Sequence, residues 1–147
     1  MTYRCQLARG RKGAKDAAQR GDVLVVVDTL SFSTSATTAV HRGGIVFPCA
    51  KDEDPAAFAQ RVQAEPAVGR PDVPAKGRFS LSPTTYFNLE PNTRIVLASP
   101  NGATCSRYAR DVPTLLVGTL INAQAVAGAI RSPQCRAKPS SAFPEHK

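Results

Sequence analysis

The chain has 147 residues, of which 42% are hydrophobic and 20% are charged. This length suits one compact domain, and the composition excludes both a disulfide-rich scaffold and a wholly disordered chain. The longest purely aliphatic run, Val23 to Val27, is much shorter than the roughly 20 residues of a membrane span, so we expect no membrane partner.

The formal net charge of +8 comes from the two ends of the chain. Residues 1–20 carry six basic residues against one acidic residue, residues 131–147 carry four against one, and residues 21–130 hold nine of each. Because the central part is neutral, it offers no basic stripe for a phosphate backbone, and we expect no nucleic-acid partner. A basic nucleic-acid binder stays open as an alternative that depends on the flanks alone.

The sequence therefore divides into three parts. These are a basic N-terminal flank (1–20), an α/β domain (21–130) and a tail (131–147) in which three prolines interrupt a polar segment, so that we expect disorder there. No apolar signal-peptide core follows the basic N-terminus. The four cysteines are widely separated, without metal-type spacing, which favours reduced thiols in a cytoplasmic protein.

Within the central part, an apolar run, a polar loop and a helix-like segment follow one another three times. The strands are expected at 22–28, 94–97 and 114–117, the loops at 29–35, 98–102 and 118–121, and the helices at 36–42, 103–110 and 122–130. A further strand is expected at 45–49, a helix at 55–65 and a long ordered loop at 67–91. Short β-branched runs without alternation are typical of buried parallel strands. The pattern predicts a three-layer α/β/α sandwich around a largely parallel or mixed sheet.

Hydroxyl and amide side chains follow each of the three strands. In an open α/β sheet, ligands bind beyond the carboxyl ends of the strands, where free backbone N–H groups at helix N-termini favour an anion. The residues concerned are Ser31, Ser33, Thr34, Ser35, Ser99, Asn101, Thr119 and Asn122. Such residues are also ordinary helix caps, so capping and a shared phosphate-sized cup both stay open.

Two charged residues stand out beside these loops. Asp28 ends an apolar run, so its carboxylate is expected at the rim of the sheet, where it suits a hard cation such as Mg²⁺ or caps its own loop. Arg70, between Gly69 and Pro71, has a guanidinium that suits two-point binding of an anion, the alternative being a solvated surface arginine. The acidic run 52–54 is interpreted as the start of a helix.

Five segments in this order are similar to the 2-phosphosulfolactate phosphatase family, which are Mg²⁺-dependent hydrolases of the coenzyme M pathway. They are Asp22–Ser35, Val68–Arg70, Phe79–Pro83, Ser99–Gly102 and Gly118–Ala123. The resemblance implies an α/β/α fold and hydrolysis of a small phosphorylated acid to sulfolactate and phosphate. Carried over by matching positions, the catalytic candidates are Asp28, which is also the metal candidate, and Arg70. The substrate-binding candidates are Ser33, Thr34, Ser80, Ser82, Asn101, Gly102 and Asn122.

The chain also departs from that family. Ser31 stands where better-known members have Arg, Val68 where they have Glu, and residues from Arg131 onward bear no likeness to the family's further strand and acidic loop. We therefore keep a shortened, catalytically weak anion-binding or interaction module as the alternative. A third strand without a neighbour would leave an exposed edge, which predicts marginal stability or association of copies.

Overall fold

The computed structural model describes residues 4–132 and 135, and its described strands all pair in parallel. The strands are β1 (Val23–Val27), β2 (Ile45–Cys49), β3 (Glu65–Pro66), β4 (Arg94–Ala98) and β5 (Thr114–Gly118). The helices are α1 (Gly10–Arg20), α2 (Phe32–His41), α3 (Pro55–Arg61), α4 (Gly102–Tyr108) and α5 (Ala123–Arg131), with 3₁₀ turns at Arg70–Asp72, Pro83–Tyr86 and Leu120–Asn122. The α/β class predicted from the sequence is confirmed.

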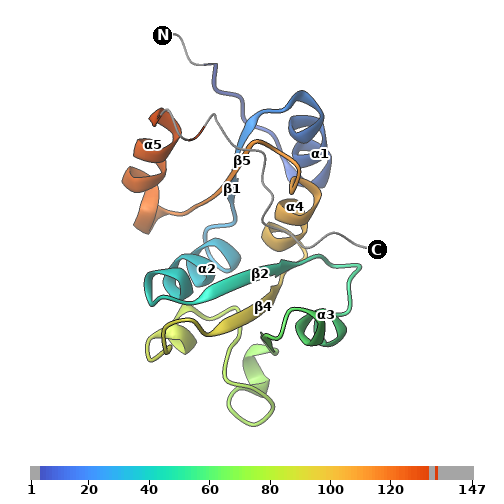
Figure 1. Ribbon diagram of the computed structural model, residues 1–147, viewed down its shortest axis with the longest axis vertical. Helices are drawn as coiled ribbons and strands as arrows, with labels where there is room; N and C mark the ends of the chain where they lie inside the picture. Colours follow the sequence, from blue (N-terminus) through green and yellow to red (C-terminus); the bar gives the residue numbers. More distant parts are fainter. Residues whose placement is uncertain (1–3, 133–134, 136–147) are drawn as a thin grey trace.

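The strands, expected in one central sheet, form two small sheets. One sheet pairs β1 with β5, and the other has the order β2-β4-β3. Figure 1 shows the β1–β5 pair at one end of the molecule and β2 with β4 toward the other. Helices α2 and α4 contact strands of both sheets. The sheets are joined by these helices and by side-chain hydrogen bonds at the strand ends instead of by a continuous backbone ladder.

The expected strands lie where the apolar runs predicted them, within one residue at each end. The helices differ more. Helix α2 begins at Phe32 instead of residue 36, because the Phe32 ring is fully buried against Leu97 and Ala103, and this packing outweighs the low helix propensity of the Ser and Thr residues that follow. Helix α3 ends at Arg61, so that the chain is free to form β3 at residues 65–66.

The basic N-terminal flank contains a helix that charge counting did not reveal. Helix α1 buries Ala14 and Ala17 and packs against α4 and β1. Its charged side chains point outward, except that the Lys15 ammonium lies 4.5 Å from the Tyr108 ring centroid. The boundary proposed at residue 20 stays a prediction, but residues 10–20 pack onto the α/β part.

The expected long loop at 67–91 is ordered by aromatic packing. Phe79 and Tyr86 stack with their ring centroids 5.3 Å apart, and both rings are buried together with Leu89 and Ile95. The Tyr86 hydroxyl donates a 2.7 Å hydrogen bond to the Ser80 carbonyl. This packing holds the loop against α2, near the ends of the strands.

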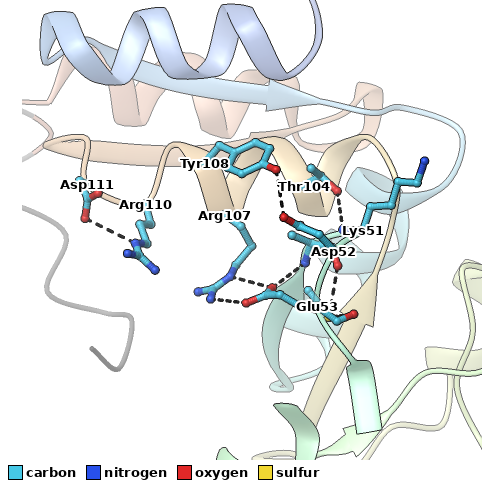
Figure 2. Close-up of polar contacts among 10 residues, drawn as sticks. Lys51, Asp52, Glu53, Thr104, Arg107, Tyr108, Arg110 and Asp111 are labelled. Atoms are coloured by element: carbon cyan, nitrogen blue, oxygen red, sulfur yellow. Dashed lines mark hydrogen bonds and ion pairs between the residues drawn. The ribbon is translucent and has the colours of Figure 1, made fainter. Parts of the chain in front are cut away.

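A buried ion pair fixes the segment after β2 to α4. The Arg107 guanidinium donates to both carboxylate oxygens of Glu53, at 2.6 and 3.0 Å, and one of these oxygens also accepts the Ala50 N–H at 2.7 Å (Figure 2). The Arg107 side chain is 6% exposed. Glu53 was interpreted from the sequence only as part of an acidic helix start. Within that run Asp54 does cap α3, accepting the Ala56 N–H at 2.9 Å.

In the part of the chain that the structure describes, no helix has the length and apolar character needed to cross a membrane. The disorder expected for residues 131–147 concerns positions that lie outside the described residues, except for 131, 132 and 135.

We expect Arg107→Gln to lower the free energy of unfolding by about 3 kcal/mol, because the Glu53 carboxylate would stay buried without its counter-charge. Urea denaturation checks this. Arg20→Gln is the matched control, since Arg20 pairs with Asp22 at the surface, and it should change stability by less than about 0.5 kcal/mol. Equal losses in the two variants would contradict the structural importance of the buried pair.

Stability should also fall at alkaline pH through Cys49. Burial, with the nearby Glu53 carboxylate, raises the pKa of the Cys49 thiol from 9.0 to about 11. Below pH 9 the thiol is protonated in both the folded and the unfolded state, and its contribution to the free energy of unfolding is fully present. As the pH rises from about 9 to about 11, the unfolded thiol ionises first, the folded state holds more protons, and about 2 kcal/mol is lost. Urea melts across this pH range should show a shallower fall for Cys49→Ala, and parallel curves would contradict the assignment.

Candidate functional site

The Asp28 carboxylate, which directly follows β1, links the two sheets. Its Oδ2 atom accepts the Gly102 N–H at 3.0 Å and the Ser99 hydroxyl at 3.3 Å. Gly102 begins α4 and Ser99 follows β4, so the bonds join the carboxyl end of β1 to the carboxyl end of β4. Asp28 is half-buried at this edge of the fold, with one oxygen engaged by the protein.

Ser33 binds the backbone of Asp28 and is not exposed to solvent. Its hydroxyl accepts the Asp28 N–H at 2.8 Å and faces the Val26 carbonyl at 3.4 Å, and the side chain is fully buried. Ser33 therefore fixes the end of β1. Its predicted direct contact with phosphate would require this hydroxyl to leave its present partners.

The segments that follow β1 and β5 also meet, through hydroxyl and amide groups. Thr34 bonds the Thr29 carbonyl and shares a 3.0 Å hydrogen bond with Thr119, which follows β5. The Asn122 amide donates to the Val117 carbonyl at 2.9 Å and to Thr37 at 3.3 Å, and its oxygen accepts the Thr119 N–H at 2.8 Å. Asn122 thus caps its own turn and ties it to α2.

Arg70 reaches the same region from the long loop. Its guanidinium donates to the Ser31 hydroxyl at 3.0 Å and to the Leu81 carbonyl at 2.8 Å. Both bonds are exposed to solvent, and Arg70 has no carboxylate partner among residues 4–132 and 135. A guanidinium that has no counter-charge in the described part of the chain therefore lies next to Ser31, the residue before α2.

The remaining candidates differ in accessibility. Ser80 is buried, and its hydroxyl accepts the Ser82 N–H at 3.2 Å, so this pair shapes the loop that carries Leu81. Asn101 is exposed, and its backbone N–H donates to the Ser99 hydroxyl at 3.3 Å. Gly102 offers its N–H to Asp28 and is itself buried. Of the substrate-binding candidates, Asn101 has the most open side chain.

The oxygen atoms of Asp28 suit a magnesium ion that is held by one carboxylate. Both protein hydrogen bonds to Asp28 go to Oδ2, which leaves Oδ1 without a hydrogen-bond partner among the described residues. Mg²⁺ is commonly held by one or two carboxylates, waters and substrate phosphate. Across the described residues no three His, Cys, Asp or Glu side chains gather into a metal cluster, so the protein does not supply a full cage.

Cys105, on α4, is the thiol next to this edge. Burial, together with the Asp28 carboxylate, raises the pKa of Cys105. A thiol with a raised pKa stays protonated at neutral pH and is a poor nucleophile.

Two surface hollows lie apart from Asp28. One of about 380 Å³ lies between α1 and α4 and is lined by Arg11, Lys12, Lys15, Asp16, Gln19 and Tyr108. Another of about 470 Å³ is lined by residues 63–65, Arg78, Glu90 and 92–94. Neither includes a predicted site residue, so the candidate site is identified by its hydrogen bonds and not by these hollows.

Comparison with known families identifies the family of the chain. A family model described as 2-phosphosulpholactate phosphatase matches residues 11–136. The chain belongs to this family. No curated protein and no solved structure matches the chain. Membership of the 2-phosphosulpholactate phosphatase family suggests phosphatase chemistry, and the match includes every residue predicted for the site.

The sequence placed Ser31 and Ser99 in the loops of the expected anion cup but did not reveal which charged residues they contact. Ser99 bonds the Asp28 carboxylate and Ser31 accepts from Arg70, so each one holds a predicted charged residue in place. Thr104 was missed altogether. Its position in the first turn of a helix directly after the Ser99–Gly102 loop was the one available signal, since a hydroxyl there can reach back to the preceding backbone.

We expect Gly102→Ala to disturb the site, because an added Cβ would lie 2.3 Å from the Phe32 ring and 2.9 Å from the Asp28 Cβ. The free energy of unfolding should fall by about 1–3 kcal/mol. Gly128→Ala is the matched control: no atom lies within 4 Å of its added Cβ, and it should stabilise α5 by about 0.5–1 kcal/mol. Thermal and urea melts compare them, and a neutral Gly102→Ala would contradict the close packing at Asp28.

Proposed function

We propose that this chain is a Mg²⁺-dependent phosphatase that hydrolyses 2-phosphosulfolactate, or a similar small phosphorylated acid, to the free hydroxy acid and phosphate. The observation that carries the proposal is the convergence on one edge of Asp28, the N-terminus of α4 and the Thr34–Thr119 contact, in a member of a phosphatase family. Together these groups come from all three strand–loop–helix units.

In this proposal Asp28 holds the magnesium ion through Oδ1, while Gly102 and Ser99 hold the other oxygen and fix the direction of the carboxylate. Magnesium, when bound, would neutralise phosphoryl charge and lower the pKa of a bound water. Asn101 has the exposed side chain available to phosphate oxygens, and Thr34 would bind them by exchanging the hydrogen bond that it donates to the Thr29 carbonyl. Ser33 supports Asp28, because its hydroxyl accepts the Asp28 N–H.

Arg70 is proposed to bind the second acid group of the substrate. Its guanidinium is solvent-exposed, is held beside α2 by a neutral hydroxyl and a carbonyl, and pairs with no carboxylate in the described chain. A sulfonate or carboxylate exchanged for the Ser31 hydroxyl would bring the opposite charge to the guanidinium and offer two oxygens to its parallel N–H groups. A phosphorylated acid with two anionic groups therefore suits this edge better than a simple phosphate ester.

The high free-energy barrier to hydrolysis of a phosphate monoester favours one alternative to an active phosphatase. Hydrolysis of a phosphate monoester requires acceleration of up to about 10²¹-fold, or about 28 kcal/mol of barrier reduction. Interaction with a helix N-terminus contributes only about 0.3–2 kcal/mol. A catalytically weak anion-binding module of the same fold is the second candidate, because no three His, Cys, Asp or Glu side chains gather among the described residues, and the Glu53 carboxylate after β2 is bound by Arg107.

The remaining proposals concern the surroundings of the protein. We propose the cytoplasm as its compartment, because all four cysteines are free thiols. Association of copies is proposed from apolar exposure on the turns after the paired strands β1 and β5, where Leu30 is 90% and Leu120 is 83% exposed.

The test is release of phosphate from 2-phosphosulfolactate with and without Mg²⁺. We expect turnover that chelation by EDTA abolishes, and a loss of at least about a hundredfold in Asp28→Asn, which keeps the shape of the side chain and removes its charge. The same assay with a phosphate monoester that has no second acid group separates the role of Arg70, since Arg70→Gln should impair phosphosulfolactate turnover more strongly.

Asp54→Asn is the matched control, because Asp54 is an exposed carboxylate that caps α3 away from the site. Full activity in Asp28→Asn would exclude the proposed metal site. Saturable binding of phosphate by calorimetry, without turnover of either substrate, would instead favour the anion-binding module.

A further inference from the structure

Strands β2 and β4 separate at the edge where Asp28 lies. Their last paired residues are Cys49 and Ala98. If the parallel pairing continued by one residue, the Lys51 N–H would donate to the Ser99 carbonyl, because each parallel rung joins an N–H to the carbonyl of the facing strand. The structure has another group in that position.

The Thr104 hydroxyl stands between these two backbone groups. It accepts the Lys51 N–H at 3.0 Å and donates to the Ser99 carbonyl at 2.8 Å. Thr104 is fully buried, and Figure 2 shows it reaching from α4 to the segment after β2. One side chain therefore replaces one rung of the ladder and spreads the two strands apart.

The residue after β4 that Thr104 separates from β2, Ser99, also binds the Asp28 carboxylate. Ser99 donates its hydroxyl to Asp28 Oδ2, and this hydroxyl also accepts the Asn101 N–H at 3.3 Å. Thr104 thus holds the Ser99 backbone while the Ser99 side chain holds the carboxylate. The Gly102 N–H, the second donor to Asp28, lies two residues before Thr104 on the same helical turn.

The rest of α4 is fixed to the same segment after β2. The Arg107–Glu53 ion pair and the 3.3 Å contact of Tyr108 with Asp52 tie the later turn of α4 to residues 52 and 53 (Figure 2). These contacts position the helix as a body. Thr104 is the contact that reaches the strand end itself.

We propose that Thr104 is a positioning residue for the active site: its hydroxyl, inserted between Lys51 and Ser99, sets the direction of the Asp28 carboxylate. This inference rests on the proposed function for its catalytic consequence, but the positioning itself has a readout that needs no activity. Thr104 touches neither substrate nor metal in this proposal and acts through Ser99.

The decisive variants are Thr104→Val, which keeps the branched shape and removes the hydroxyl, and Thr104→Ser, which restores the hydroxyl. Ser106→Ala is the matched control, since Ser106 is a buried hydroxyl of the same helix that bonds only the Gly102 carbonyl of its own helix, at 2.9 Å. The Gly102 N–H donates to Asp28, so this amide should be protected from exchange with deuterium. We expect its exchange to become at least about tenfold faster in Thr104→Val and to stay slow in Thr104→Ser and Ser106→Ala.

In the phosphatase assay we expect Thr104→Val to lower kcat by about tenfold while KM changes by less than about twofold, with recovery in Thr104→Ser. Unchanged exchange of the Gly102 amide in folded Thr104→Val, or equal loss of activity in Thr104→Ser, would overturn the proposal. If the wild-type protein does not hydrolyse phosphate esters, the proposed function fails, and exchange of the Gly102 amide still decides the positioning role.

The wild-type protein provides a test that does not depend on the folding of any variant. If Thr104 accepts the Lys51 N–H, this amide should exchange with deuterium much more slowly than the neighbouring Asp52 amide, although both side chains are exposed. Exchange of Lys51 at the rate of an open turn would show that the bridge is absent and would overturn the proposal.

Discussion

The fold depends on a carboxylate that takes the place of a backbone ladder. Asp28 joins the end of β1 to the start of α4 through Gly102 and Ser99, at the point where the two sheets come together. A half-buried carboxylate needs such donors, because burial of an unsatisfied charge is strongly unfavourable. The same requirement explains Gly102, since a larger residue would push Asp28 away from the N–H that it accepts. The fold and the proposed chemistry therefore use different oxygens of one side chain, because both protein hydrogen bonds go to Oδ2.

Much of the chain could be predicted because local signals and tertiary structure agree. The aliphatic runs give the strands, and Asp54 before Pro55 gives the start of α3. Helix α1 was missed because its sequence is dominated by charge, while its burial involves only two alanines. The early start of α2 could not be read locally, since it depends on the burial of Phe32 against residues more than sixty positions away.

For the candidate site, the sequence indicated which residues meet but not what their polar atoms do. Asp28 and Arg70 were expected to face ligand, and each has hydrogen-bonding capacity left for one. Ser33 and Asn122 were expected there as well, yet their polar groups already hold backbone or neighbouring hydroxyls. A pattern of hydroxyl and amide residues after strands cannot separate these cases, because a helix cap and a phosphate ligand use the same atoms.

The splitting of the strands into two sheets links ligand occupancy to the cohesion of the whole molecule. The edge around Asp28 is where parts from both sheets touch, so a ligand seated there would contact both at once. Any compound that binds only the folded form shifts the unfolding equilibrium by RT ln(1 + [L]/Kd). In this molecule such a compound would also connect the two sheets at that edge, where hydrogen bonds to Asp28 join them. Resistance to heat and to proteases would then report occupancy, even for a compound that is never turned over.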